Sequence, residues 1–155
     1  MAGKIDARLK LLGIELPAAA TPVANYVPWV RSGNLLFIAG QIPVRDGKDA
    51  FSGKLGGGVT VEQGRQAARL CAINVLAQVK AALDGDLNRV VRCVRLTGYV
   101  NAVPEFGEHP QVVNGASDLM VEVFGDAGRH SRAALGAGSL PRNVSVEVDA
   151  VFEVN

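Results

Sequence analysis

The feature that most constrains the fold is a run of alternating residues between Val144 and Phe152. Apolar side chains occupy every second position of this run, and Glu147 and Asp149 fall between them. Successive side chains of a β-strand point to opposite faces, so the run predicts a strand with one apolar and one acidic face. Such a strand must pair with other strands in a sheet, which excludes an all-helical fold.

A short β-like run precedes this strand and begins at Arg132. Between the two runs, Leu140-Pro141-Arg142-Asn143 has the composition of a turn that reverses the chain. We therefore predict two closing strands, at 132–138 and 144–153, paired as a hairpin. This pairing would place a fixed guanidinium and the carboxylates on adjacent strands, where they could hold a small carboxylate and position a water molecule.

The rest of the sequence contains both helical and β patterns, separated by glycine and proline. Apolar spacing and the turn and capping signals predict these elements in chain order: a short helix at 4–12, an extended connector at 16–22, strands at 26–31 and 35–39, a loop at 45–58, a helix at 61–83, a strand at 90–100 and a helix at 111–124. The order is hairpin, helix, strand, helix, hairpin. It predicts an α+β fold with a single mixed β-sheet and two helices packed on one face.

The length of 155 residues predicts one folded domain, at 22–155, preceded by an N-terminal helix and connector at 1–21. Hydrophobic residues make up 48% and aromatic residues only 5%, so the core must consist mainly of Val, Ala and Leu. No element is left to cover the second face of the sheet, and Ala39, Tyr99 and Val151 on that face are not strongly polar. We expect this face to be buried in a homo-oligomer.

Charge and targeting signals exclude several classes of partner. Sixteen basic and fifteen acidic residues give a net charge of +1, so no nucleic-acid partner is expected. The N-terminal residues are too charged for a signal peptide, and no run of about 18 apolar residues predicts a membrane span. We therefore expect a cytoplasmic protein with no membrane partner.

Several motifs with familiar chemistry are absent or incomplete. Cys71 and Cys93 are far apart and form no C-x-x-C pair, which indicates two reduced packing thiols. No Gly-Lys-Ser/Thr follows the glycines at 56–58, which are interpreted as a flexible connector. His109 and His130 have no neighbouring ligand cluster, so no metal is expected; His109 could begin a helix and His130 would lie in a solvated basic loop. No G-x-S-x-G motif supports a serine hydrolase.

Arg132 is the strongest candidate for a functional residue, with two interpretations left open. It could be a surface or interface arginine, or it could bind a carboxylate through its planar fork of donors. Small residues around it leave room for a ligand. Glu147 could equally be the solvent side of a strand, and Asn114 a local helix cap.

Several motifs together resemble the YjgF-type reactive-intermediate deaminase (RidA) superfamily, also labelled endoribonuclease L-PSP. The motifs are Asn25-Tyr26-Val27, Gly33-Asn34-Leu35, Ala39-Gly40-Gln41-Ile42-Pro43, Val113-Asn114, and Arg132 through Leu140-Pro141 to Val146-Glu147-Val148. The resemblance extends over roughly residues 22–154. It implies a homotrimer of chorismate-mutase-like α+β subunits that hydrolyses enamine and imine intermediates, such as 2-aminoacrylate, to 2-keto acids and ammonia without metal or cofactor.

The resemblance also implies roles for individual residues in a cleft between subunits. Arg132 would hold the substrate carboxylate, and Glu147 would help to position the attacking water. The other residues that would line the cleft are Tyr26, Gly40, Asn114 and, through its backbone, Ala134.

This sequence departs from the family pattern at three places. Many members have a cysteine where Ala134 stands and a Ser or Thr where Ala39 stands, and a bulkier strand is replaced by Gly136-Ala137-Gly138-Ser139. The sequence therefore looks like a divergent branch with an N-terminal extension and a wider pocket. Two other functions stay open: a non-catalytic trimer that binds a small carboxylate, and an endoribonuclease or translation inhibitor, which the charge balance disfavours.

Overall fold

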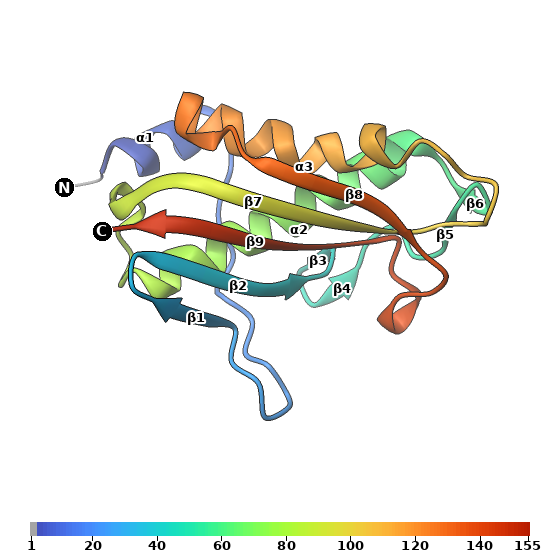
Figure 1. Ribbon diagram of the computed structural model, residues 1–155, viewed down its shortest axis with the longest axis horizontal. Coiled ribbons are helices and arrows are strands. Elements are labelled where there is room, and N and C mark those ends of the chain that lie inside the picture. The colour runs from blue at the N-terminus through green and yellow to red at the C-terminus, as the bar shows by residue number, and fades with distance from the viewer. Residues whose placement is uncertain (1–2) are drawn as a thin grey trace.

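The computed structural model describes residues 3–155, whose centre is a five-stranded mixed sheet (Figure 1). The strands of this sheet are β1 (Trp29–Ser32), β2 (Leu35–Gln41), β7 (Val90–Asn101), β8 (Ser131–Ala137) and β9 (Val146–Val154). Their order is β1-β2-β9-β7-β8, and only β7 and β8 run parallel to each other. The predicted α+β class with a mixed main sheet is confirmed.

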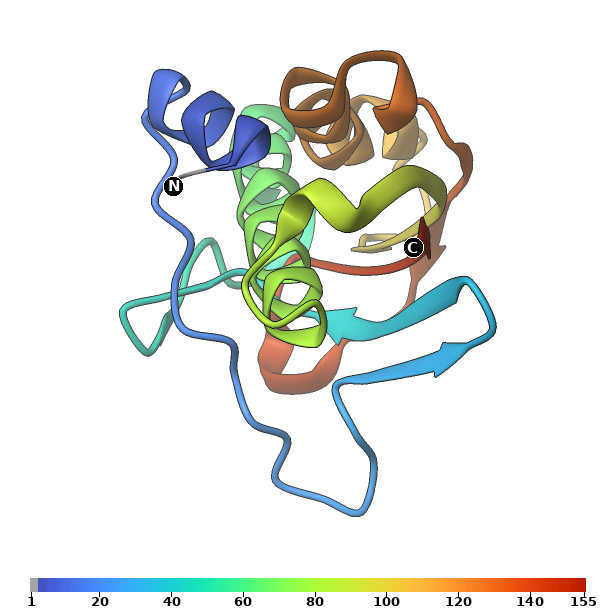
Figure 2. The same ribbon diagram turned by 90° about the vertical axis from the view of Figure 1, so that its left-hand side faces the viewer.

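Two long helices, α2 (Val61–Ala82) and α3 (His109–Phe124), pack against each other and against the same face of the sheet, as predicted (Figure 2). The predicted capping box begins α2. Thr60 Oγ1 accepts a hydrogen bond from the Gln63 backbone N–H at 3.1 Å, and Gln63 Oε1 accepts one from the Thr60 N–H at 3.0 Å. Two of the unpaired donors at the start of the helix are thereby satisfied.

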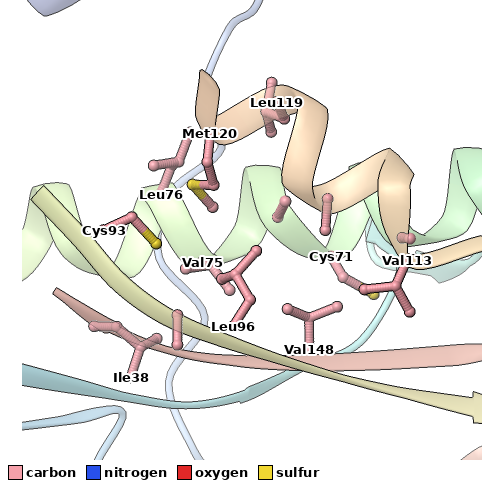
Figure 3. Packing of buried hydrophobic residues seen from close by; sticks show 14 of the residues in the cluster. Ile38, Cys71, Val75, Leu76, Cys93, Leu96, Val113, Leu119, Met120 and Val148 are labelled. Carbon is pink, nitrogen blue, oxygen red and sulfur yellow. The ribbon is translucent and has the colours of Figure 1, made fainter. Parts of the chain in front are cut away.

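The core lies between these two helices and the sheet (Figure 3). The apolar positions predicted from helical spacing on α2 and α3 are buried, and so are Val146, Val148, Ala150 and Phe152 of β9. Both cysteines are free and lie in this core, which confirms that they are packing thiols. Burial raises the pKa of the Cys93 thiol to about 12, and burial together with the Glu147 charge raises that of Cys71 well above its ordinary value. Neither thiol is therefore a nucleophile at neutral pH.

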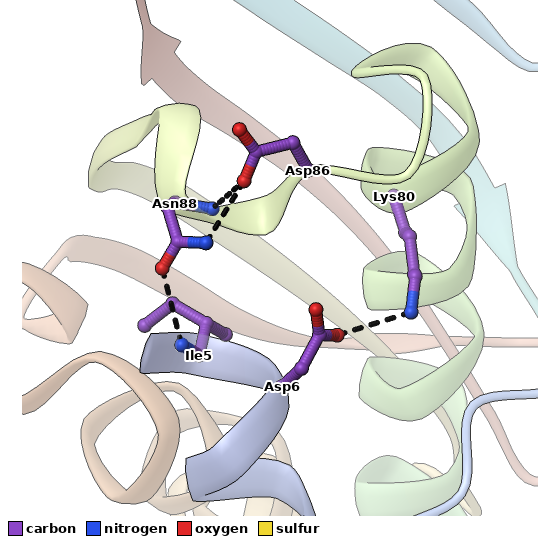
Figure 4. A network of polar contacts seen from close by, with 5 residues as sticks. All are labelled: Ile5, Asp6, Lys80, Asp86 and Asn88. Atoms are coloured by element: carbon purple, nitrogen blue, oxygen red, sulfur yellow. Dashed lines mark hydrogen bonds and ion pairs between the residues drawn. The ribbon is translucent and has the colours of Figure 1, made fainter. Parts of the chain in front are cut away.

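The N-terminal helix α1 (Lys4–Leu11) is docked onto the same body (Figure 4). The Ile5 backbone N–H donates to Asn88 Oδ1 at 3.2 Å, and Lys80 Nζ donates to Asp6 Oδ1 at 3.1 Å. Leu9 of this helix is buried in the core formed by the other elements. Helix α1 thus shares the hydrophobic core of the main sheet.

The predicted closing hairpin is wrong. β8 (Ser131–Ala137) is an edge strand parallel to β7, and β9 (Val146–Val154) lies between β2 and β7. The turn at Leu140 is real and contains a short 3₁₀ helix, Pro141–Asn143, but it carries the chain past the end of β7 rather than back along β8. Alternating side chains identify a strand but do not identify its neighbour, which explains the error.

Two further boundaries differ from the prediction. The first strand begins at Trp29 instead of Tyr26, and Tyr26 lies in an irregular, exposed segment. The predicted loop at 45–58 contains four two-residue strands, β3 (Val44–Arg45), β4 (Lys48–Asp49), β5 (Lys54–Leu55) and β6 (Gly58–Val59). They form two small sheets beside the main one; Gly56 and Gly57 make the tight turn between β5 and β6, and Gly58 begins β6.

The second face of the main sheet carries no helix within residues 3–155 (Figure 2). Val30, Leu35, Phe37 and Leu135 on this face are between 38% and 53% exposed, which is unusual for large apolar side chains on three strands of one sheet. No helix in this part of the chain is both long and apolar enough to cross a membrane.

Candidate functional site

A cluster of polar side chains holds Arg132 in place on β8. Register pairs Arg132 with Leu96, a core residue, so the arginine points to the face of the sheet that α3 covers. Its Nη1 donates to Asn114 Oδ1 at 2.7 Å and to Ser117 Oγ at 3.2 Å. Asn114 lies in the middle of α3 and accepts from Arg132, so its interpretation as a local helix cap is wrong.

His130 completes this arginine cluster, which we define as Arg132, Asn114, Ser117 and His130. The imidazole Nδ1 lies 2.6 Å from the Gly128 carbonyl oxygen, and its Nε2 lies 2.9 Å from Ser117 Oγ. A carbonyl can only accept, so Nδ1 carries the proton and Nε2 accepts from the serine hydroxyl. His130 is half-buried in this contact, and its predicted place in a solvated loop is wrong.

The surroundings of His130 favour the neutral form of its imidazole. Burial lowers the pKa of His130 below its ordinary value, and the positive charge of Arg132 lowers it further, against a contrary effect of the Gly128 carbonyl. His130, Ser117 and Arg132 therefore form a chain of hydrogen bonds. The Ser117 hydroxyl donates to His130, and the Ser117 oxygen accepts from Arg132. Such a chain fixes the plane of the guanidinium.

The charge of Arg132 has no counterpart in the described part of the chain. None of the ion pairs between residues 3–155 includes Arg132, and only its Nη1 donates to protein groups. Nε and Nη2 form one edge of the guanidinium and can donate two parallel hydrogen bonds to a carboxylate. The arrangement is suited to binding a small organic anion.

A second cluster, the carboxylate cluster, lies on the opposite face of the sheet and consists of Glu147, Asp149 and Tyr99. Tyr99 Oη donates to Asp149 Oδ2 at 3.1 Å, and Glu147 pairs with Tyr99 in the register of β9 and β7. Burial raises the pKa of Glu147, and the negative charge of Asp149 raises it further. Burial followed by the charge of Asp149 also raises the pKa of Tyr99. Glu147 can therefore bind or release a proton at a higher pH than an isolated carboxyl group.

Gly40 lies directly against the carboxylate cluster. A methyl group at this position would collide with Glu147 Oε1, so only glycine lets the carboxylate lie against the backbone of β2. Gly40 and Tyr26 line a common cavity of about 630 Å³ beneath the connector that precedes β1. Three of the six predicted site residues, Tyr26, Gly40 and Glu147, thus belong to one region.

The other three, Arg132, Asn114 and Ala134, belong to a separate region on the covered face. Ala134 pairs with Gly98 of β7, on the same side as Arg132. The expectation that Arg132 and Glu147 lie on adjacent strands is wrong, because β7 separates β8 from β9 and the two side chains point to opposite faces. The single chain therefore holds the predicted site residues in two separate regions.

Two residues of the arginine cluster, Ser117 and His130, were not predicted from the sequence as site residues. Ser117 lies three positions after Asn114, so both side chains lie on one face of α3, and this spacing is a signal that could have identified the serine. His130 gives no such signal, because its contact with Ser117 depends on how the chain leaves the 3₁₀ helix Gly125–Gly128. Among residues 3–155, no three His, Cys, Asp or Glu side chains are grouped so that they could hold a metal ion.

Comparison with known proteins relates this chain to a family and to solved structures of the same fold. Residues 6–153 match the family described as "YjgF/chorismate mutase-like, putative endoribonuclease". Protein TCP17 of Trypanosoma cruzi is 50% identical over 154 residues, which cover 99% of this chain and 96% of TCP17. RutC family protein PH0854 of Pyrococcus horikoshii is 28% identical over 133 residues, covering 86% of this chain and 90% of that protein.

The crystal structure of Atu1372, a protein of unknown function from Agrobacterium tumefaciens, has the same fold. Its chain is 53% identical to this one and superposes with a TM-score of 0.92, covering 97% of this chain and 92% of Atu1372.

Proposed function

The chain belongs to the YjgF/chorismate mutase-like family, and on that premise we propose that it hydrolyses reactive imines and enamines to 2-keto acids and ammonia. The observation that carries the proposal is the edge of the Arg132 guanidinium, which is oriented by Asn114 and Ser117 and has no carboxylate partner among residues 3–155. Substrates such as 2-aminoacrylate, an enamine that tautomerises to the imine, then have a carboxylate on the carbon of the reactive C=N bond. Binding that carboxylate would fix the position of the imine carbon.

We propose that the active unit is a homotrimer whose clefts lie between neighbouring subunits. Arg132 and Glu147 point to opposite faces of one sheet, so a single subunit cannot bring them to one substrate. A neighbouring copy can place its carboxylate cluster and Tyr26 opposite the arginine cluster. Burial of the exposed apolar face, with Phe37 44% exposed, would stabilise that assembly.

In this cleft, Glu147 would act on the attacking water. Its raised pKa makes it a better proton acceptor than an isolated carboxylate. Water adds to the imine carbon and gives up a proton to the carboxylate, and the nitrogen is protonated as the C–N bond breaks. The products are a C=O group and ammonia, so neither a metal nor a redox cofactor is required by the balance of the reaction.

The test is to measure keto-acid release from freshly generated imines. An amino-acid oxidase or a serine/threonine dehydratase supplies them, and the wild type is compared with Arg132→Ala. Loss of the charge-assisted contact should weaken substrate binding about ten- to a hundredfold. Acceleration by the wild type that disappears in the variant supports the proposal. Failure of the wild type to accelerate hydrolysis of any imine, with the oligomer intact, contradicts it.

One alternative is supported by a specific residue. Ala134 provides no thiol or hydroxyl beside Arg132, which favours a trimer that binds a small carboxylate without turnover. This alternative predicts saturable binding of 2-keto acids that requires Arg132 and is accompanied by no imine hydrolysis.

A further inference from the structure

One titratable group of the arginine cluster, the imidazole of His130, takes no part in the proposed reaction. The chain has two histidines, and the other, His109, lies over Gly136 near the far end of β8. His130 is half-buried, and both of its ring nitrogens are engaged, one with Gly128 and one with Ser117 of α3. A histidine that can change its charge beside a ligand-binding cation can alter how that cation binds its ligand.

The hydrogen bonds of the neutral imidazole join it to the guanidinium through a single atom. Ser117 Oγ lies 2.9 Å from His130 Nε2 and 3.2 Å from Arg132 Nη1. In the neutral ring Nε2 accepts from the serine hydroxyl, because Nδ1 donates to the Gly128 carbonyl. The imidazole and the guanidinium are therefore neighbours that share one serine oxygen.

A second proton on the imidazole would be carried by Nε2 and directed at the same oxygen. A hydroxyl oxygen has two acceptor lone pairs, so Ser117 can accept from His130 and from Arg132 at once, with its own hydrogen turned away. Protonation therefore keeps the cluster together and adds a positive charge close to the guanidinium. Burial and the charge of Arg132 both oppose this change and lower the pKa of His130, while the Gly128 carbonyl acts in the opposite direction.

Among the charged groups of residues 3–155, Arg132 is the one whose charge shifts the pKa of His130. The other charged residues on the elements packed around the imidazole are Arg92, Arg95, Asp118, Asp126, Arg129 and Glu153. All of these except Glu153 are exposed, so water and salt screen their effects. A ligand that neutralises Arg132 would therefore remove the main charge that opposes protonation.

We propose that carboxylate binding at Arg132 is coupled to proton uptake by His130, so that the ligand binds more tightly as the pH falls. The inference rests on the proposed function, because it takes the guanidinium as the carboxylate site. A bound carboxylate offsets the positive charge of Arg132 and so raises the pKa of His130. Linkage requires the converse, that protonated His130 increases the affinity for the carboxylate by the same factor.

The separation of the charges sets the size of this coupling. A carboxylate on the free edge of the guanidinium would lie roughly 8 Å from the imidazole, and charges at that spacing change an affinity about three- to thirtyfold. The gain begins as the pH falls through the pKa of His130 in the bound protein. It is complete below the pKa in the free protein, which is lower than the ordinary histidine value. A 2-keto acid stays ionised throughout this range.

The experiment is isothermal titration calorimetry of pyruvate binding between about pH 5 and 8, the range in which a histidine titrates. Each pH is measured in two buffers of different ionisation enthalpy, because the difference between them gives the protons taken up on binding. We expect the affinity of the wild type to rise about three- to thirtyfold toward low pH, with net proton uptake across the transition. Binding that is independent of pH overturns the inference.

Three variants assign the proton to one residue. His130→Gln cannot be protonated but keeps an acceptor for Ser117, so it should bind pyruvate with little dependence on pH. His109→Gln removes the other histidine and should behave as the wild type. Glu147→Gln removes a second group that could take up a proton in the proposed cleft, and it should retain the coupling. Proton uptake that survives His130→Gln, or that disappears in Glu147→Gln, overturns the inference.

A direct measurement follows the imidazole of His130 by NMR. In the His109→Gln background every imidazole signal belongs to His130, because the chain has two histidines. The pKa of His130 should rise when pyruvate is saturating. An unchanged pKa contradicts the coupling even where the affinity varies with pH.

Proton uptake is measured on binding alone, so the two proposals can fail separately. Hydrolysis of imines together with pH-independent keto-acid binding overturns the coupling and leaves the hydrolase activity standing. Coupled binding without hydrolysis of any imine supports the coupling and contradicts the hydrolase activity. If no keto acid binds at any pH, the coupling is overturned whether or not imines are hydrolysed.

Discussion

The arginine cluster and the carboxylate cluster lie on the two faces of one sheet and differ in how their charges are compensated. Arg132 is surrounded by neutral acceptors, Asn114 and Ser117, which orient the cation and leave its charge unpaired. Glu147 lies beside Asp149, a group of the same sign, and burial raises its pKa. Among residues 3–155, neither Arg132 nor the two carboxylates form an ion pair, as expected for a site shared between two copies.

Neutralising Glu147 should have the largest effect on activity. Glu147→Gln keeps the shape of the side chain and removes its ability to exchange a proton. We expect kcat for imine hydrolysis to fall by about 10²–10⁴-fold, while keto-acid binding through Arg132 is retained. A decrease in keto-acid affinity with unchanged kcat would assign Glu147 to substrate binding instead.

Mixing two inactive variants tests whether the clusters meet across subunits. Arg132→Ala and Glu147→Gln proteins, unfolded together and refolded at equal concentration, should form mixed trimers. In about a quarter of the clefts an intact arginine would then face an intact carboxylate from a neighbour, and activity should return in proportion. Each variant refolded alone is the control. If the mixture is no more active than either variant, the shared site is wrong.

Arg132→Lys tests whether the fork of donors or the charge alone is needed. A lysine keeps the positive charge but cannot donate two parallel hydrogen bonds, so it should remain about tenfold or more impaired in kcat/KM. Steady-state kinetics with a short imine measure this, with Arg31→Lys on exposed β1 as the matched control. Full activity of Arg132→Lys would show that charge alone is sufficient.

Several local features of the fold and of the carboxylate cluster could be predicted from the sequence. The alternation from Val144 to Phe152 correctly placed Glu147 and Asp149 opposite the apolar face, because burial follows the period of two in any half-buried strand. The capping box at Thr60 and the apolar spacing of α2 were also confirmed, since both are local properties of the chain.

The relative position of the two clusters could not be predicted, because strand order is a property of the whole sheet. The turn after β8 favoured a hairpin, and nothing within residues 131–154 indicates that β7 lies between the two strands. For the same reason His130 was missed: its contact with Ser117 joins a helix to a segment that only the folded chain brings near it.

The contribution of Ser117 is expected to be small but measurable. Ser117→Ala removes one of two hydrogen bonds to Nη1 and the link to His130, which should raise KM about two- to tenfold with little change in kcat. Ser32→Ala, at the exposed end of β1, is the control. An unchanged KM would show that Asn114 alone positions the guanidinium.

The smallest expected effect is a change in pH dependence. The charge of Asp149 contributes to the raised pKa of Glu147, so Asp149→Asn should lower that pKa while keeping an acceptor for Tyr99. A base that must be ionised loses activity as the pH falls through its pKa. The acid side of the kcat profile should therefore move to lower pH in the variant. A profile that does not move would exclude Glu147 as the group whose ionisation limits the rate.

The position of β9 between β2 and β7 affects how the chain folds. Leu36 of β2 pairs with Phe152, and Val100 of β7 pairs with Val146. Both strands that neighbour β9 are therefore far from it along the chain. Such distant pairings form slowly, and until they form, β2 and β7 have open edges that can pair with another chain. Refolding from denaturant should therefore restore helical signal well before imine hydrolysis, because the strand that carries Glu147 closes the sheet.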